Sequence, residues 1–318
     1  MQHRFGFPRL EPSSQVTVTS VFVGDRKAPF KWIEVDPDIV NAEYIAGISF
    51  DYHRFKHRSF VTQLDSKNGH HALSAMRQNH LELCEYLCAL LCAFIQAPNA
   101  VGFWLTRYRN NHLDALAEDL YNATTNPKVD LSAGVFKDLL ALAQAIYKDP
   151  SEQQGFLDLA HHILENYLGD GQRAEYGALK HSDRTYSGAF EVQSLNATVK
   201  ARNAIHYIAS VDKESPTERL AVIEYNSRPI ALKPYLTEIE TTFTWGVELL
   251  GFIKAYAAGH AYVPGNRFKP EQVSKVVTWG GKNMGVIINT PLFEIGGQAL
   301  TDVRDIKSAD GRLDADID

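Results

Sequence analysis

An arginine and a histidine four residues apart are the first candidates for chemistry in this sequence: Arg202 and His206, in the run ARNAIHYIAS. Residues at this spacing share a face of a helix, and the even spacing also places them on one face of a strand. A guanidinium can hold a phosphate through two hydrogen bonds, and an imidazole can move a proton near neutral pH. We therefore predict that Arg202 and His206 are catalytic residues. They would promote cleavage of RNA by the substrate's own 2′-hydroxyl, with no metal and no cofactor. The alternative is a surface arginine and histidine beside a hairpin.

A second basic segment is the run YGALKHSDR, residues 176–184. It brings Lys180, His181 and Arg184 within nine residues, and a turn with such groups can bind an anion such as a phosphate. In the alternative interpretation, the two fixed charges are solvated and His181 or Asp183 caps a helix end.

A third segment, YHRFKHRSF at residues 52–60, alternates basic and aromatic side chains. Arg54, Lys56 and Arg58 can neutralise phosphates while aromatic rings stack on bases, so the segment indicates contact with single-stranded nucleic acid. A strand with one buried face would show the same aromatic spacing, with its charges turned to water.

The run from Arg202 to His206 resembles the motif of the HEPN superfamily, a helical family that includes many RNases of defence and toxin systems. That motif is an arginine, often followed by a polar residue such as asparagine, and then a histidine after four to six intervening residues. Here only three residues intervene. The resemblance implies that Arg202 steadies the phosphate, that His206 acts as acid or base, and that RNA or a nucleotide is the partner of a homodimer. Because spacing determines which groups converge, this shorter spacing is a departure from the family's pattern.

The segment YGALKHSDR also looks like a YNALKHG-like motif of uncharacterised bacterial proteins, in which a QAP…WL..Y segment lies upstream. That upstream segment would be Gln96-Ala97-Pro98 with Trp104, Leu105 and Tyr108. Gly177 and Ser182 depart from the usual asparagine and glycine. The resemblance covers residues 70 to 260 and implies a shared fold without an activity.

Metal sites and the common nucleotide motifs find little support in the sequence. Cys84, Cys88 and Cys92 recur every four residues in an apolar run and are interpreted as buried core residues of a reducing compartment. The histidine pairs 70–71 and 161–162, the second with Glu165, lack an HExxH pattern, so no metal is expected. No GxGxxG, GxxxxGK[ST] or GxSxG motif occurs.

The elements that must position these residues change character along the chain. Residues 15–24, 31–35 and 44–51 predict strands, because β-branched and aromatic residues are frequent there. Apolar periodicity then predicts helices over 71–96, 101–108, 112–122, 132–148, 151–168 and 234–259. Residues 198–210 fit a helix or a strand, and a β-hairpin with residues 220–225 is favoured. A second hairpin is expected over 273–279 and 284–289.

The fold class is therefore predicted to be α+β and predominantly α, a helical bundle with a small N-terminal sheet and two β-hairpins. We expect a β-rich segment over residues 1–65, a helical domain over 66–300 and a frayed acidic tail over 301–318. The longest apolar run, Tyr86 to Ile95, has ten residues, too few to span a membrane, and no secretory signal is visible, so a cytoplasmic protein without membrane contact is expected. The alternative to RNA chemistry is a non-catalytic interaction or ligand-binding module.

Overall fold

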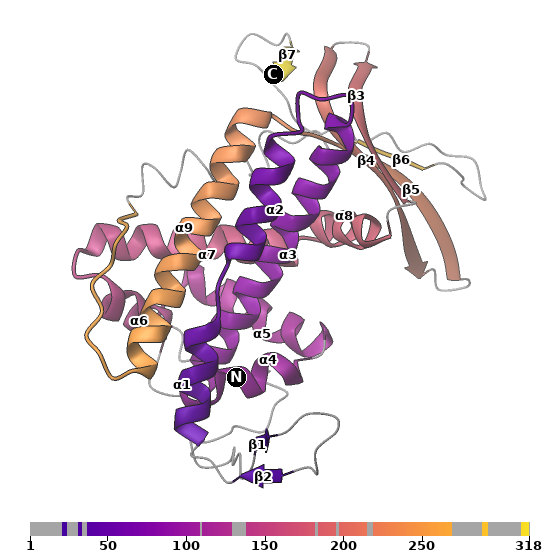
Figure 1. Ribbon diagram of the computed structural model, residues 1–318. Helices are drawn as coiled ribbons and strands as arrows, with labels where there is room; N and C mark the ends of the chain where they lie inside the picture. Colours follow the sequence, from indigo (N-terminus) through magenta and orange to yellow (C-terminus); the bar gives the residue numbers. More distant parts are fainter. Residues whose placement is uncertain are drawn as a thin grey trace. The chain divides into compact units, whose positions relative to one another are not determined.

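The computed structural model describes residues 21–23, 31–33, 37–108, 110–128, 138–181, 184–194, 197–214, 219–268, 288–291 and 313–317. The chain is mostly helical with a smaller share of strands, which confirms the predicted α+β class (Figure 1). It divides into two compact units, each made of separated segments. Unit 1 comprises residues 1–50, 84–168 and 242–273, and unit 2 comprises residues 51–83, 169–241 and 274–318. The boundary expected near residue 65 falls inside unit 2.

The regular elements described in unit 1 are helices and a two-stranded antiparallel ribbon. The ribbon is formed by β1 (Val21–Val23) and β2 (Lys31–Ile33). The helices are α1 (Pro37–Gly47), the C-terminal half of α3 (Gly69–Gln96), the 3-10 helix η1 (Pro98–Ala100), α4 (Val101–Arg107), α5 (Asn110–Thr125), α6 (Leu139–Ile146), α7 (Pro150–Leu168) and the C-terminal part of α9 (Leu232–Ala257).

The core of unit 1 forms where the apolar periodicity is strongest. The C-terminal half of α3 is apolar on nearly every side and is buried along its length, including its three cysteines, which are not joined in disulfides. On α9, Trp245 stacks on Phe156 of α7 with ring centroids 5.0 Å apart and donates its indole N–H to the Phe156 carbonyl at 3.1 Å. The prediction that the cysteines are core residues is confirmed.

Two predictions for the helical region need correction or fall outside the described residues. The strand expected over 44–51 is wrong, because α1 continues to Gly47 and α2 (Asp51–Val61) begins four residues later. Ile45 and Ile48 are both buried at a spacing of three, which places two side chains on one face of a helical turn but on opposite faces of a strand. The helix start expected at Ser132 lies outside the described residues, and α6 begins at Leu139, capped by the side chain of Asp138.

Unit 2 combines helices with a β-sheet. Its helices are α2, the N-terminal half of α3, α8 (Asp170–Lys180) and the first turns of α9. The sheet has the order β3-β4-β5-β6, with β7 paired beside β4, and its strands are β3 (Thr185–Ser194), β4 (Ala197–Glu214), β5 (Arg219–Pro229), β6 (Ile288–Pro291) and β7 (Leu313–Ile317).

The favoured hairpin over residues 198–225 is confirmed, because β4 and β5 pair antiparallel along a long ribbon (Figure 1). Of the second expected hairpin, only β6 lies among the described residues, and it pairs with β5. The tail was expected to be frayed, which is wrong for Leu313–Ile317, because these residues form β7 and pair parallel with β4. An ordered ladder of backbone hydrogen bonds holds this acidic segment, whose charges do not prevent pairing.

Helix α8 was not predicted as a separate element. Its C-terminal part packs on the sheet, where Ala174 and Ala178 contact Tyr207 of β4. The backbone N–H of Arg184 donates to the carbonyl of His181 at 2.8 Å, and this turn leads directly into β3. Among the described helices of both units, none combines the length and the apolarity that a membrane span requires.

Candidate ligand-binding site

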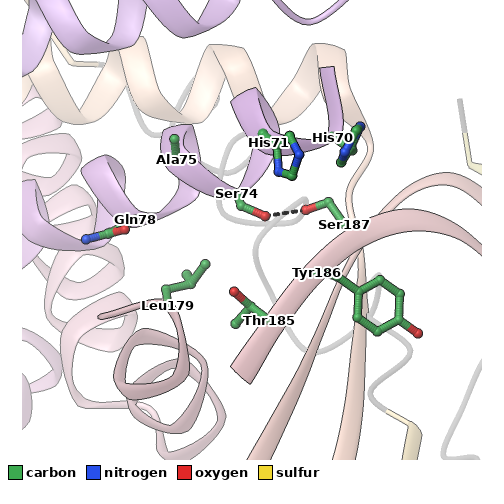
Figure 2. A pocket seen from close by; sticks show the side chains of 9 residues that line it. All are labelled: His70, His71, Ser74, Ala75, Gln78, Leu179, Thr185, Tyr186 and Ser187. Carbon is green, nitrogen blue, oxygen red and sulfur yellow. Dashed lines mark hydrogen bonds between the residues drawn. The ribbon is translucent and has the colours of Figure 1, made fainter. Parts of the chain in front are cut away.

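A cavity of about 350 Å³ opens in unit 2 where α3, the end of α8 and the start of β3 meet (Figure 2). Small-molecule sites have volumes from about 300 to 1,000 Å³, so this cavity suits a small ligand or one part of a larger one. Its lining is His70, His71, Ser74, Ala75, Gln78, Leu179, Thr185, Tyr186 and Ser187.

The helical periodicity of α3 determines which side chains form the polar wall of this pocket. His71, Ser74 and Gln78 follow one another at intervals of three and four, so one face of α3 presents all of them. Across the cavity, Thr185 and Ser187 extend from one side of β3, and the ring of Tyr186 lies on the other side of the strand (Figure 2).

The two walls meet through their hydroxyl groups. The Oγ atoms of Ser74 and Ser187 are 2.5 Å apart and share a hydrogen bond (Figure 2). Ser187 is buried, so this contact fixes β3 against α3 at the floor of the pocket. Hydroxyls donate or accept as needed, and this pair can therefore turn a donor towards a ligand oxygen.

The predicted anion-binding residues Lys180, His181 and Arg184 connect two lining residues, Leu179 and Thr185. All three are exposed, and they form the end of α8 and the turn that follows it. The Nζ atom of Lys180 lies 3.9 Å from the ring centroid of Tyr176, so part of its charge is directed to that ring. The structure thus brings the predicted segment beside the pocket.

A buried ion cluster holds the helices that frame the pocket. Glu175 of α8 is fully buried and receives two hydrogen bonds from Arg77 of α3, from Nε to Oε1 at 2.9 Å and from Nη2 to Oε2 at 3.0 Å. The Nε atom of Arg228, on β5, lies 2.7 Å from the same Oε2, although its N–H is not aligned for a hydrogen bond. One carboxylate therefore joins α3, α8 and β5.

The charges of this cluster are stable near neutral pH. Burial alone would raise the pKa of Glu175, but the guanidiniums of Arg228 and Arg77 outweigh it and lower that pKa below its ordinary 4.5. Burial opposes the charge on Arg77 too, and Glu175 reverses the effect, so the pKa of Arg77 is raised. The carboxylate stays ionised and keeps both arginines in place.

The predicted catalytic residue His206 lies on β4 and is only 5% exposed. Its Nδ1 atom is 2.8 Å from the Oγ of Ser227, and its ring stacks on Tyr186 with centroids 4.5 Å apart. Burial lowers the pKa of His206 below 6.5, partly offset by a backbone hydrogen bond at Ala189. A buried imidazole in these contacts is poorly placed to exchange protons with a substrate.

Arg202 is exposed on the same strand, and a β-bulge separates it from His206. Between the pairs Gly188↔Ala204 and Phe190↔Ala201, β3 advances two residues while β4 advances three. One extra residue shifts the alternation of side chains, so Arg202 and His206 fall on opposite faces of the sheet. The structure therefore does not bring this pair together.

The basic aromatic segment 52–60 lies on helix α2 instead of a strand, the alternative considered for it. Lys56 forms an ion pair with Glu82 of α3 at 3.0 Å, and Arg54 is half-buried. Arg58 is exposed, together with the rings of Tyr52 and Phe55. Of the three cations in this segment, Arg58 is therefore the most accessible to a partner.

The histidine pairs fall in different surroundings. His70 and His71 line the pocket, with ring centroids 3.9 Å apart. In unit 1, the Nδ1 atom of His161 is 2.6 Å from the Oγ1 of Thr124, and its ring stacks on Tyr121. Within the part of the chain that the structure describes, no three His, Cys, Asp or Glu side chains are arranged to hold a metal.

The hydroxyl wall of the pocket was missed in the sequence. Ser74 and Ser187 are 113 residues apart, and neither belongs to a recognisable motif. The one local signal is the polar stripe of His71, Ser74 and Gln78 on a helix that is otherwise largely apolar.

Comparison with protein-family models, curated proteins and solved structures finds no match to this chain. The resemblance to the HEPN superfamily is neither supported nor opposed by these comparisons, and it stays a prediction.

Proposed function

We propose that unit 2 binds a small phosphorylated ligand of the nucleotide class, with its phosphate in the pocket between α3 and β3. The observation that carries this proposal is the lining itself: two imidazoles, an amide and the hydroxyls of two serines and a threonine surround about 350 Å³. A ligand-binding module was the alternative to RNA chemistry in the sequence analysis, and the proposal names nucleotides as the class of ligand.

The charge around the pocket favours an anion. The nine lining residues include no Asp or Glu, and Lys180 and Arg184 belong to the connection between α8 and β3 at its edge. A phosphate would find hydroxyl and imidazole donors beside fixed cations, the combination that recognises phosphate oxygens.

RNA cleavage by Arg202 and His206 has weaker support than binding. His206 is buried, and the bulge places Arg202 on the other face of the sheet. Acid–base catalysis requires a group within hydrogen-bond reach of the reacting atoms. We therefore propose a binding function and treat cleavage as an outcome of the test.

The test is isothermal titration calorimetry of the full chain with AMP, inorganic phosphate and adenosine. We expect AMP to bind with a Kd below about 1 mM and adenosine to bind at least ~10-fold more weakly, because the phosphate supplies the main contacts. Replacing both pocket histidines, His70→Ala with His71→Ala, should weaken AMP binding ~10-fold or more. The control is His260→Ala, since His260 is exposed and belongs to unit 1.

Absence of binding by all three compounds, or equal binding by the histidine variant, would overturn the proposal. The same samples incubated with RNA in the presence of a chelator test the catalytic hypothesis. Cleavage that His206→Ala abolishes, in a variant that keeps its circular dichroism spectrum, would favour catalysis over binding.

A further inference from the structure

Helix α2 presents an exposed face that carries two aromatic rings between opposite charges. Tyr52 is 65% exposed and Phe55 is 70% exposed. Asp51 begins the helix and Arg58 lies in its last turn, and both are exposed. Asp51 and Arg58 are seven residues apart, so they lie on one line along the helix with Phe55 between them.

The side of α2 that carries His53, Lys56 and His57 is occupied within unit 2, and the Nζ of Lys56 also lies 4.6 Å from the ring centroid of Tyr52. His53 contacts Asn79 at 2.9 Å, Lys56 pairs with Glu82, and the Nε2 of buried His57 is 3.4 Å from Glu240. The inner contacts fix the rotation of the helix. Exposed aromatic rings that lie together on one helix suit an interaction surface, because they offer apolar area to a partner.

We propose that this face, Asp51, Tyr52, Phe55 and Arg58, pairs with the same face of a second copy of the chain in an antiparallel helix dimer. The charges on this face are self-complementary. When two copies of the helix pair in opposite directions, Asp51 of each copy lies opposite Arg58 of the other, and one twofold axis relates the two contacts.

The aromatic residues fit the same arrangement. Pairing Asp51 with the partner's Arg58 places the twofold axis between residues 54 and 55. The two Phe55 residues then lie about 1.5 Å apart along the helix direction and meet across the axis, with each Tyr52 beside them. Aromatic anchors at the centre and charges at the rim are the usual anatomy of an interface.

A second copy fits this face better than a nucleic acid does. Binding a single strand requires several cations that track the phosphates. Here Lys56 is held by Glu82, and Asp51 would repel a phosphate from the face that carries Arg58. An apolar stripe with an acidic residue at one end and a basic residue at the other instead matches a second copy of the same stripe that runs in the opposite direction.

The test is sedimentation equilibrium of the full chain up to about 300 µM, a range that detects even weak association. We expect a reversible dimer of the native chain. Phe55→Ala should weaken it at least ~10-fold, the usual loss for a central aromatic anchor. Val263→Ala removes a side chain that is 82% exposed in unit 1 and serves as the control that leaves the dimer unchanged.

Two charge variants make the test specific for antiparallel pairing. Asp51→Arg and Arg58→Asp should each weaken self-association ~10-fold, because like charges then face each other. An equimolar mixture of the two variants should associate again, since each supplies the charge that the other lacks. Folding is checked by circular dichroism, because both changes oppose the helix dipole.

A native chain that stays monomeric, or a mixture that fails to associate while both variants are folded, would refute the dimer. A monomer that binds oligouridylate through Tyr52 and Phe55 would refute it too and would assign the face to nucleic acid. None of these outcomes depends on the nucleotide titration of the pocket.

Discussion

Arg77 holds Glu175 through two parallel hydrogen bonds of 2.9 and 3.0 Å, and both side chains are buried. The two residues are 98 positions apart in the sequence, and their pairing clamps α3 to α8. Ser74 and Leu179, which line the pocket, lie one helical turn from Arg77 and Glu175 respectively. The spacing of two pocket walls therefore depends on an ion pair that no ligand touches.

The first prediction concerns the loss of that charge. Glu175→Gln should lower the free energy of unfolding by about 3 kcal/mol, because Arg77 and Arg228 would be left without their carboxylate. Urea denaturation followed by circular dichroism measures it. Glu240→Gln is the control, since the Glu240 side chain is 63% exposed and its loss should cost less than about 0.5 kcal/mol. Equal losses of unfolding free energy for the two variants would show that the buried ion cluster stabilises the fold no more than a surface carboxylate does.

A second prediction follows from the lowered pKa of Glu175. The unfolded chain takes up a proton near the ordinary pKa of 4.5, before the folded chain does, so the stabilisation by Glu175 is present above pH 4.5 and declines as the pH falls below it. The difference in unfolding free energy between the native chain and Glu175→Gln should thus shrink as the pH falls from about pH 5 towards pH 3. Urea midpoints at four or five pH values measure this, and a constant difference would contradict it.

His206 gives a third prediction, with a pH window closer to neutrality. Its pKa is lowered by burial, so the unfolded chain binds a proton below pH 6.5 while the folded chain remains neutral. Unfolding free energy should fall as the pH drops from about 7.5 to 5.5, and the fall should be smaller in His206→Phe, which keeps a ring against Tyr186. His260→Phe, at an exposed position, is the matched control, and an equal fall in the native chain and in His206→Phe would contradict the prediction.

A fourth prediction compares two glycines inside helices. At Gly155 of α7, a Cβ would collide with the carbonyl oxygen of Phe268, and backbone does not yield easily. Gly155→Ala should therefore destabilise the chain by about 2 kcal/mol. At Gly177 of α8, nothing lies within 4 Å of a new Cβ, so Gly177→Ala should stabilise it by about 0.5–1 kcal/mol. The melting temperature measured by thermal unfolding should fall for Gly155→Ala and rise for Gly177→Ala.

Lys254 provides the fifth prediction, in unit 1. Its Nζ donates to the carbonyls of Ala46 at 2.9 Å and Ile48 at 2.7 Å and so completes the C-terminal end of α1. Lys254→Met should cost about 1–2 kcal/mol, because the carbonyls lose a charged donor. Lys233→Met, at an exposed lysine of the same helix, is the matched control and should change the melting temperature little.

The long helices could be predicted because each repeats apolar residues every three or four positions over many turns. Helices α3 and α9 were both expected from such patterns, and their ends agree within a few residues. The segment with Ile45, Ile48 and Phe50 was too short to distinguish the two periods. Its helical state depends on contacts such as that of Lys254, which lies more than 200 residues away.

The candidate site was only partly accessible to sequence reasoning. Lys180, His181 and Arg184 could be selected because they are close in the chain. Ser187 could not, because its importance arises only when β3 meets α3. The spacing of Arg202 and His206 was misleading for a related reason: a bulge depends on the register of the neighbouring strand and is invisible in the sequence of β4.

Neither unit is continuous in sequence, since α3 and α9 each begin in unit 2 and end in unit 1. No single cut of the gene yields one intact unit, and a fragment that keeps the pocket residues 70–78 and 179–187 also keeps about half of unit 1. Such a chain cannot donate or acquire either half by simple recombination, so the two units must be inherited together. The roles of the two units can accordingly be separated by point substitutions but not by truncation.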